Sequence, residues 1–267
     1  MSDFTVSVII STYNAPLYLR LSLQSLLEQT HMPDEVIIAD DGSGLETKVV
    51  IDAFRDRCPV RVKHVWQEDT GFRKAAITNR AAAAAASDYL IVVDGDLLLH
   101  RHLVRDHCDL AAPGVFLSAS RVPLPHCTTR RILSGSTKGV NLLHRLTFFN
   151  GWRFRCVMHW VSERYKQGPK YRYRTPKGCN MSMWRDDLIS VNGYDEDFEG
   201  WGYEDTELAV RLRHTGLKML NVKFGALVFH MWHGNASRAK GEKNRRRMLD
   251  SIEEGKLRCE NGIDKYL

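Results

Sequence analysis

The chain has 267 residues, is 43% hydrophobic and carries a formal net charge of +6. This length suffices for one large α/β domain, and the sequence lacks the apolar run of about 18 residues that a transmembrane helix needs. Six cysteines without a C-x-x-C pair predict reduced thiols, not a disulfide framework or a zinc site. Because only five residues precede the first apolar run, we expect no signal peptide and a cytoplasmic location, with peripheral attachment to the inner face of the cytoplasmic membrane as an option.

The N-terminal third of the chain alternates between short apolar runs and amphipathic segments. We expect strands at 6–10, 36–39, 60–66 and 89–93, and helices at 18–29, 45–57 and 72–86. Strand–helix repetition at this spacing is typical of a mostly parallel, doubly wound sheet flanked by helices.

The pattern is looser after residue 96. We expect a helix at 100–110, a strand at 115–119, and an insertion at about 120–177 with helices around 140–149 and 158–165. Regular structure resumes with strands at 179–184 and 222–229, helices at 185–190 and 204–215, and a basic C-terminal helix at 238–260.

The positive charge is concentrated in the expected insertion. Between Arg121 and Lys177, thirteen lysines and arginines accompany a single acid, Glu163, so the rest of the chain is net negative. A second basic run lies between residues 238 and 247. Segregated blocks of this kind favour anionic partners, such as a phosphorylated acceptor, an anionic membrane surface or nucleic acid.

An acidic element, Asp94-Gly95-Asp96, directly follows the apolar strand expected at 89–93. Such a strand ends at the rim of the sheet, where open α/β folds bind ligands. Two carboxylates there suit a hard divalent cation held against a phosphate, although an isolated D-x-D is more often a solvated turn.

Three further loops should reach the same rim, because each follows a strand: 11–14, 40–43 and 68–74. Asp40 or Asp41 can accept a hydrogen bond from a nucleotide base, and Arg73 and Lys74 can face a phosphate near a helix start. The chain has neither G-x-G-x-x-G nor a P-loop, which weakens dinucleotide-binding and NTPase interpretations.

Two C-terminal elements complete the candidate site. In the segment 198–205, Trp201 lies between two glycines and precedes Glu204 and Asp205, so an aromatic platform for a sugar stands beside a candidate general base. His230 and His233 follow an expected strand, and either one could supply a nitrogen to a metal.

Together these motifs resemble the family 2 glycosyltransferases with the GT-A fold, a Rossmann-like α/β architecture. The resemblance rests on V-S-V-I-I-S-T-Y-N at 6–14, A-D-D-G-S at 39–43, the segment from Gly71 through Arg80, D-G-D at 94–96 and F-E-G-W-G-Y-E-D at 198–205. The last element is also similar to that of β-1,4-galactosyltransferases and bacterial chondroitin-type synthases, although Tyr203 stands where the galactosyltransferases have glycine.

The resemblance implies one GT-A domain over 1–267, with a nucleotide-sugar half at 1–118 and an acceptor half at 119–267. It implies nucleotide contacts from Thr12, Tyr13, Asn14, Asp40, Asp41, Arg73, Lys74 and Asp94. It assigns Mn²⁺ or Mg²⁺ to Asp96 with His233 or His230, the general base to Asp205, and the acceptor sugar to Trp201, Tyr203 and Glu204.

The expected activity is inverting transfer of a hexose or N-acetylhexosamine from a nucleotide sugar, UDP-linked by preference, to a glycan or lipid-linked acceptor. Synthesis of a cell-surface polysaccharide or lipopolysaccharide is the expected setting. The alternatives are a nucleotidyltransferase, which usually needs a basic Gly-rich loop after the first strand, and a non-catalytic carbohydrate-binding module. Nucleic acid is disfavoured, because it would not explain Trp201 beside two acids.

Overall fold

The computed structural model describes residues 3–119, 121–136, 176–223, 225–234 and 239–267. Four parallel strands form the first half of the main sheet: β1 (Val6–Thr12), β2 (Glu35–Asp40), β3 (Arg61–Trp66) and β4 (Tyr89–Asp94). They are connected by α1 (Pro16–Leu26), α2 (Leu45–Arg55) and α3 (Lys74–Ala84). The predicted strand–helix alternation is confirmed.

The main sheet continues beyond β4 with a change of direction. Its order is β3-β2-β1-β4-β8-β6-β9, where β8 (Asn180–Trp184) runs antiparallel to both of its neighbours, β4 and β6 (Val115–Ala119). The edge strand β9 (Lys218–Val222) is parallel to β6. The described strands thus form a mixed, largely parallel sheet.

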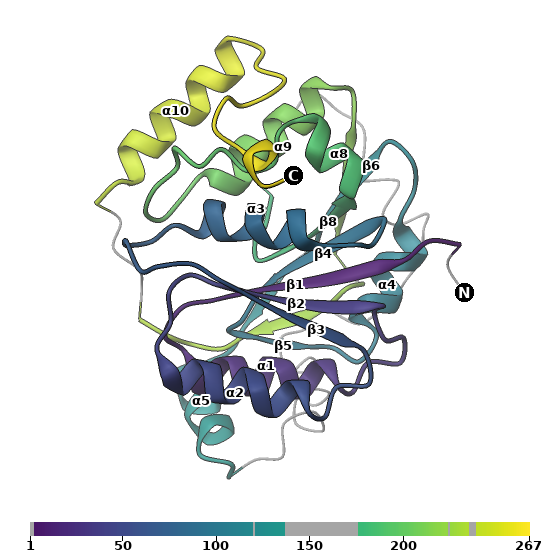
Figure 1. The fold of residues 1–267 in the computed structure, drawn as a ribbon, viewed down its shortest axis with the longest axis vertical. Helices are drawn as coiled ribbons and strands as arrows, with labels where there is room; N and C mark the ends of the chain where they lie inside the picture. Colours follow the sequence, from purple (N-terminus) through teal and green to yellow (C-terminus); the bar gives the residue numbers. More distant parts are fainter. Residues whose placement is uncertain (1–2, 120, 137–175, 224, 235–238) are drawn as a thin grey trace.

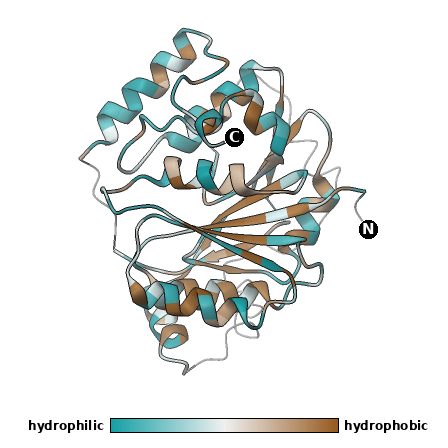
Figure 2. Ribbon diagram, viewed as in Figure 1, coloured by the Kyte–Doolittle hydropathy of each residue, from teal (hydrophilic) through white to brown (hydrophobic). Residues whose placement is uncertain are grey.

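Helices cover both faces of this sheet (Figure 1). α1 and α2 lie on one face, whereas α3 lies on the other with α8 (Arg185–Ser190), α9 (Glu204–His214) and the short η2 (Ile263–Tyr266). α10 (Gly241–Glu253) packs outside α9 and carries mostly polar residues, whereas the central strands are hydrophobic (Figure 2).

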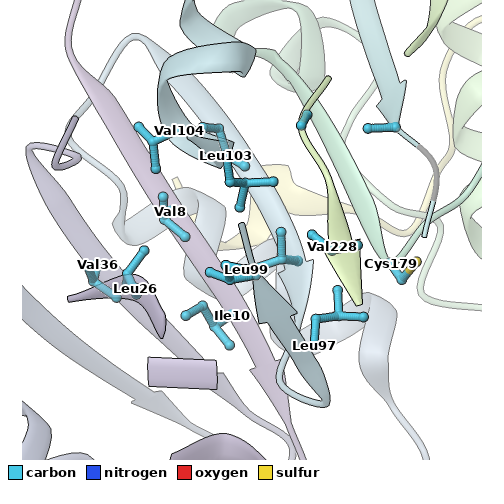
Figure 3. Packing of buried hydrophobic residues seen from close by; sticks show 14 of the residues in the cluster. Val8, Ile10, Leu26, Val36, Leu97, Leu99, Leu103, Val104, Cys179 and Val228 are labelled. Atoms are coloured by element: carbon cyan, nitrogen blue, oxygen red, sulfur yellow. The ribbon is translucent and has the colours of Figure 1, made fainter. Parts of the chain in front are cut away.

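Alternating side chains of β1 explain the two layers of the core. Val8 and Ile10 point into the cluster beneath α1 and α2, and Ile9 points into the cluster beneath α3 and α9. The first cluster also contains Leu97 and Leu99 of a second, smaller sheet (Figure 3). Burial of both faces is the reason why these strands read as continuous apolar runs.

The second sheet has the order β5-β10-β7, from β5 (Leu97–Leu99), β10 (Val228–His230) and β7 (Arg121–Pro123). Each of its strands has three residues, which is too short for a periodic pattern, and β5 and β7 were not predicted from the sequence. β7 and α5 (His126–Leu133) also occupy the beginning of the segment predicted as an insertion. The helices predicted at 140–149 and 158–165 lie outside the described residues.

The single strand predicted at 222–229 is wrong. β9 ends at Val222 and β10 begins at Val228, and the two strands belong to different sheets. The chain turns between them at Ala226, which has φ +47 and is held by hydrogen bonds from and to buried side chains. The basic helix predicted at 238–260 is shorter, because α10 ends at Glu253.

Candidate functional site

The acidic turn after β4 packs tightly against β1. Ser11 Oγ donates a hydrogen bond to Asp94 Oδ1 at 3.0 Å, and the Lys74 ammonium lies 2.7 Å from the same oxygen. A Cβ on Gly95 would lie 2.8 Å from the carbonyl oxygen of Ser11, so a larger residue would force the backbone apart. The glycine between the two acids is therefore required by packing.

The loops after β1 and β2 are tied together at the same edge of the sheet, on the left in Figure 1. Asn14, with φ +43, donates its N–H to Ser43 Oγ at 2.8 Å and accepts a hydrogen bond from the Gly44 N–H at 3.0 Å. Its neighbour Tyr13 is 47% exposed and donates its hydroxyl to Asp69. An exposed ring at this position is available to a nucleotide base.

The two acids predicted to recognise a base already have protein partners. His64 Nε2 lies 2.9 Å from Asp40, and Asp41 accepts hydrogen bonds from the Gln67 amide and from the backbone N–H of Arg73. Burial raises the pKa of Asp41 above its ordinary value. These contacts tie the ends of β2 and β3 to the start of α3, and base recognition by either acid stays a prediction.

Three buried polar atoms along this edge have no hydrogen-bond partner among the described residues: Thr12 Oγ1, Asp96 Oδ1 and Asp205 Oδ1. Leaving such an atom unpaired costs about 1–3 kcal/mol. These atoms of β1, the β4 turn and α9 are therefore available to a polar ligand at the candidate site.

Asp96, His230 and His233 converge on one point. Asp96 Oδ2 lies 3.3 Å from His230 Nε2 and 2.9 Å from His233 Nε2, and the two nitrogens are 3.2 Å apart. Three atoms held about 2.1 Å from one metal ion at 90–110° would lie about 3.0–3.4 Å apart. The residues present therefore fit a divalent ion, and His233 Nδ1, 2.7 Å from the Gly234 carbonyl oxygen, has the outer partner typical of a metal-binding imidazole.

The charges in this cluster are mutually dependent. Burial opposes ionisation of Asp96, but hydrogen bonds with His230 and His233 hold its pKa well below the ordinary range. The hydrogen bond with Asp96 in turn raises the pKa of His233. Both histidines contact the same carboxylate, so the structure does not favour one of them over the other.

A buried hydrogen-bond network that the sequence analysis missed holds the turn before β10 in place. His107 in α4 (Leu103–Leu110) lies 2.7 Å from Ser182 Oγ and 2.9 Å from Asn180 Oδ1, and burial lowers its pKa to about 4. Asn180 and Asp106 bind the carbonyl oxygen and the N–H of Ala226, just before β10. In the sequence, the only indication of this network is the polar pair Asp106-His107 among the apolar buried residues of α4.

Glu204 and Asp205 open α9 beside the same edge. Burial and the charge of Asp205 raise the pKa of Glu204 to about 7, and burial raises the pKa of Asp205 against the nearby ammonium of Lys74. The carboxylates around Lys74 outweigh its burial and hold its pKa well above the ordinary value. The structure thus brings a predicted nucleotide residue next to the predicted base.

Gly178 is another residue that the sequence analysis missed. A Cβ at this position would lie 1.6 Å from Oδ2 of Asp205, so the backbone of residue 178 lies directly on the carboxylate. This contact contributes to the burial of Asp205, and a larger residue at 178 would displace the carboxylate. Nothing in the local sequence indicates this contact.

The loop that carries Trp201 is anchored on both sides. The Gly200 N–H donates to the Phe72 carbonyl oxygen at 3.0 Å, and Glu199 pairs with Lys240 at 2.8 Å and with Arg73 at 3.5 Å. Trp201 is 42% exposed. The side chain of Arg73, a predicted phosphate contact, thus binds the loop that carries Trp201.

Comparisons with known proteins identify the family of this chain. Residues 7–117 match the model of glycosyl transferase family 2, and residues 158–234 match that of the N-terminal domain of galactosyltransferase. Validoxylamine A glucosyltransferase of Streptomyces hygroscopicus subsp. limoneus is 32% identical over 228 residues, covering 80% of this chain and 49% of the relative. Chondroitin synthase of Escherichia coli is 25% identical over 244 residues, covering 84% and 34%. The chain therefore spans about half the length of the first relative and about a third of the second.

Solved structures share the fold. A mannosyltransferase of Pyrobaculum calidifontis in complex with GDP-Man and Mn²⁺ has a TM-score of 0.62 at 20% identity, covering 92% of this chain and 62% of its own. Glucosyl-3-phosphoglycerate synthase of Mycobacterium tuberculosis, in complex with Mn²⁺ and UDP, has a TM-score of 0.56 at 18% identity, covering 96% and 81%.

The fold is that of the GT-A class of glycosyltransferases. Within that class, residues 7–117 form a family 2 glycosyltransferase domain, and a galactosyltransferase-type segment follows it. The resemblance drawn from the sequence is confirmed. No described helix is both long and apolar enough to cross a membrane.

Proposed function

We propose that this protein is an inverting, metal-dependent glycosyltransferase that uses a UDP-linked hexose or N-acetylhexosamine. The observation that carries the proposal is the convergence of Asp96, His230 and His233 at the sheet edge where the nucleotide loops end, with Asp205 close to the Lys74–Asp94 pair. Solved neighbours that hold Mn²⁺ with a nucleotide or a nucleotide sugar support it.

Asp96, His230 and His233 would hold Mn²⁺ or Mg²⁺, whose charge would stabilise the departing diphosphate. Asp205 accepts the proton of an acceptor hydroxyl through its unpaired Oδ1. The acceptor oxygen bonds to the anomeric carbon as the bond between that carbon and the diphosphate oxygen breaks, and the electron pair leaves with the nucleoside diphosphate. A single displacement inverts the anomeric configuration, so an α-linked donor gives a β-linked product.

Lys74 assists without touching the reacting atoms. Its ammonium binds Asp94 and offsets the negative charge around Asp205, which favours the ionised form that a general base needs. Trp201 supplies an exposed ring for the acceptor sugar, because aromatic faces stack on the apolar faces of sugars.

The acceptor is proposed to be a glycan or a lipid-linked glycan of a cell-surface polysaccharide or lipopolysaccharide. Relatives named chondroitin synthase and hyaluronan synthase support a polysaccharide. The positive charge of 121–177 supports a phosphorylated acceptor or an anionic membrane surface, although most of that segment lies outside the described residues. A small hydroxylated acceptor is the second candidate, because the relatives at 32% identity are named for validoxylamine A.

Calorimetric titration of UDP tests the donor site directly. We expect binding in Mn²⁺ that weakens at least about tenfold in EDTA, and a similar loss in Asp96→Asn at low Mn²⁺. Asp109→Asn, an exposed change in α4 paired with Arg105, is the matched control and should bind UDP normally. Equal affinity with Mn²⁺ and with EDTA would contradict the proposed metal role.

A further inference from the structure

Tyr203 adopts a backbone conformation that disfavours its side chain. Its φ is +73, in the left-handed region, where a bulky residue is an outlier and glycine is at ease. It lies directly before the first turn of α9, and its carbonyl oxygen accepts a hydrogen bond from the Glu207 N–H. A glycine would make the same turn, so the backbone alone does not explain tyrosine here.

Tyr203 is half-buried, but no specific contact within the described part of the chain accounts for its ring. It belongs to none of the three apolar clusters and packs against none of them. The phenol has no hydrogen bond, and the ring has no aromatic or cation partner, among the described residues. A strained backbone at a residue without such partners is typical of functional positions.

We propose that Tyr203 is a specificity-determining residue for the acceptor, an inference that rests on the proposed function. Tyr203 lies two residues after Trp201 in the sequence and immediately before Glu204 and Asp205. A ring there offers a stacking face to a pyranose and occupies space that a glycine would leave open to bulky substituents. Tyr203 therefore favours acceptors whose sugar ring is unsubstituted next to the reacting hydroxyl.

The test compares Tyr203→Gly, Tyr203→Leu and Tyr203→Phe in the full chain. Gly removes both the strain and the ring, Leu retains the strain but removes the ring, and Phe retains both while removing the hydroxyl. We expect Gly to raise Tm by about 1–4 °C, because strain relief exceeds the added entropy of the unfolded chain. Leu and Phe should not raise Tm.

Acceptor use is measured with p-nitrophenyl β-D-glucopyranoside, p-nitrophenyl N-acetyl-β-D-glucosaminide and validoxylamine A. We expect Gly and Leu to shift the ratio of kcat/KM between the unsubstituted and the N-acetylated glycosides by about tenfold toward the N-acetylated one. Phe should retain the wild-type ratio. Identical acceptor profiles for wild type and Gly, including no transfer by either, would overturn the proposal, as would a fall in Tm of the Gly variant.

Metal-dependent hydrolysis of the donor without acceptor distinguishes failure of the proposed function from failure of the role of Tyr203. Wild type and Asp109→Asn should hydrolyse the donor at equal rates, because Asp109 is an exposed residue of α4 outside the proposed site. If wild type hydrolyses no nucleotide sugar, the proposed function fails. If donor hydrolysis is normal but the acceptor profile is unchanged in Gly and Leu, only the role of Tyr203 fails.

Discussion

Glu204 and Asp205 are adjacent carboxylates, and Lys74 supplies the one ammonium close to both among the described residues. Both acids have raised pKa values, so ionising the two together costs more free energy than ionising two exposed acids. Lys74 favours ionisation of Asp205, and Gly178 lets the backbone lie directly on that carboxylate. The charge balance of these residues sets the pH at which the proposed base becomes active.

Asp205→Asn should reduce kcat by about 10²–10⁴-fold, the usual contribution of a general base. The amide retains the shape of the carboxylate but cannot accept the proton, so UDP affinity in Mn²⁺ should stay within about twofold of wild type. Steady-state kinetics and calorimetry on the same preparation check both expectations. A variant with near-normal turnover would show that Asp205 is not the base.

The pH dependence of kcat/KM should show a loss of activity on the acid side, beginning near pH 7. Glu204 has a pKa of about 7, and Asp205 is raised as well, so the pair gains protons as the pH falls, and a protonated Asp205 cannot act as a base. Glu204→Gln removes one negative charge and should move this loss to lower pH. A profile measured at saturating Mn²⁺ that stays flat between about pH 5.5 and 8 would contradict the assignment.

At the scale of elements, the sequence predicted the β1–β4 alternation, because long buried strands and amphipathic helices leave clear periodic signals. It did not predict β5, β7 or the break between β9 and β10. Strands of three residues are too short for periodicity, and the break at Ala226 depends on contacts with Asp106 and Asn180, which are distant in sequence.

In the candidate site, too, local patterns could be predicted from the sequence and contacts between distant residues could not. D-G-D and the segment 198–205 are visible because their chemistry lies in consecutive residues. The support from His107, the contact of Gly178 with Asp205 and the pairing of Arg73 with Glu199 depend on tertiary structure. The choice between His230 and His233 could not be made in advance, because both lie against Asp96 in the fold.

The loop that carries Trp201 should loosen in Glu199→Gln. The change removes ion pairs with Lys240 and Arg73, which as partly exposed pairs contribute about 0.2–1 kcal/mol each. Hydrogen exchange at the Gly200 amide should therefore accelerate by a few-fold, while exchange in β4 stays unchanged. Glu242→Gln, on the exposed side of α10, is the matched control. Equal exchange in both variants would show that the ion pairs do not hold the loop.

At the scale of the whole molecule, the parallel β1–β4 half and the α9 half meet at one edge of the sheet. The first half supplies Thr12, Lys74, Asp94 and Asp96, and the second supplies Glu204, Asp205 and the two histidines. Lys74 and Arg73 join the halves, because each contacts or faces carboxylates of the other half. This division agrees with a donor that lies on the first half and an acceptor that approaches from the second.

The most direct test of the central claim is UDP release from a panel of UDP-sugars without acceptor, in Mn²⁺ and then in EDTA. We predict slow hydrolysis of one donor class in Mn²⁺ and its loss in EDTA, because a metal held by Asp96 and the histidines would stabilise the departing diphosphate. Hydrolysis that continues at the same rate in EDTA would contradict metal dependence. No hydrolysis of any UDP-sugar would contradict the proposed donor, and CMP-, GDP- and dTDP-sugars would then be measured in the same assay.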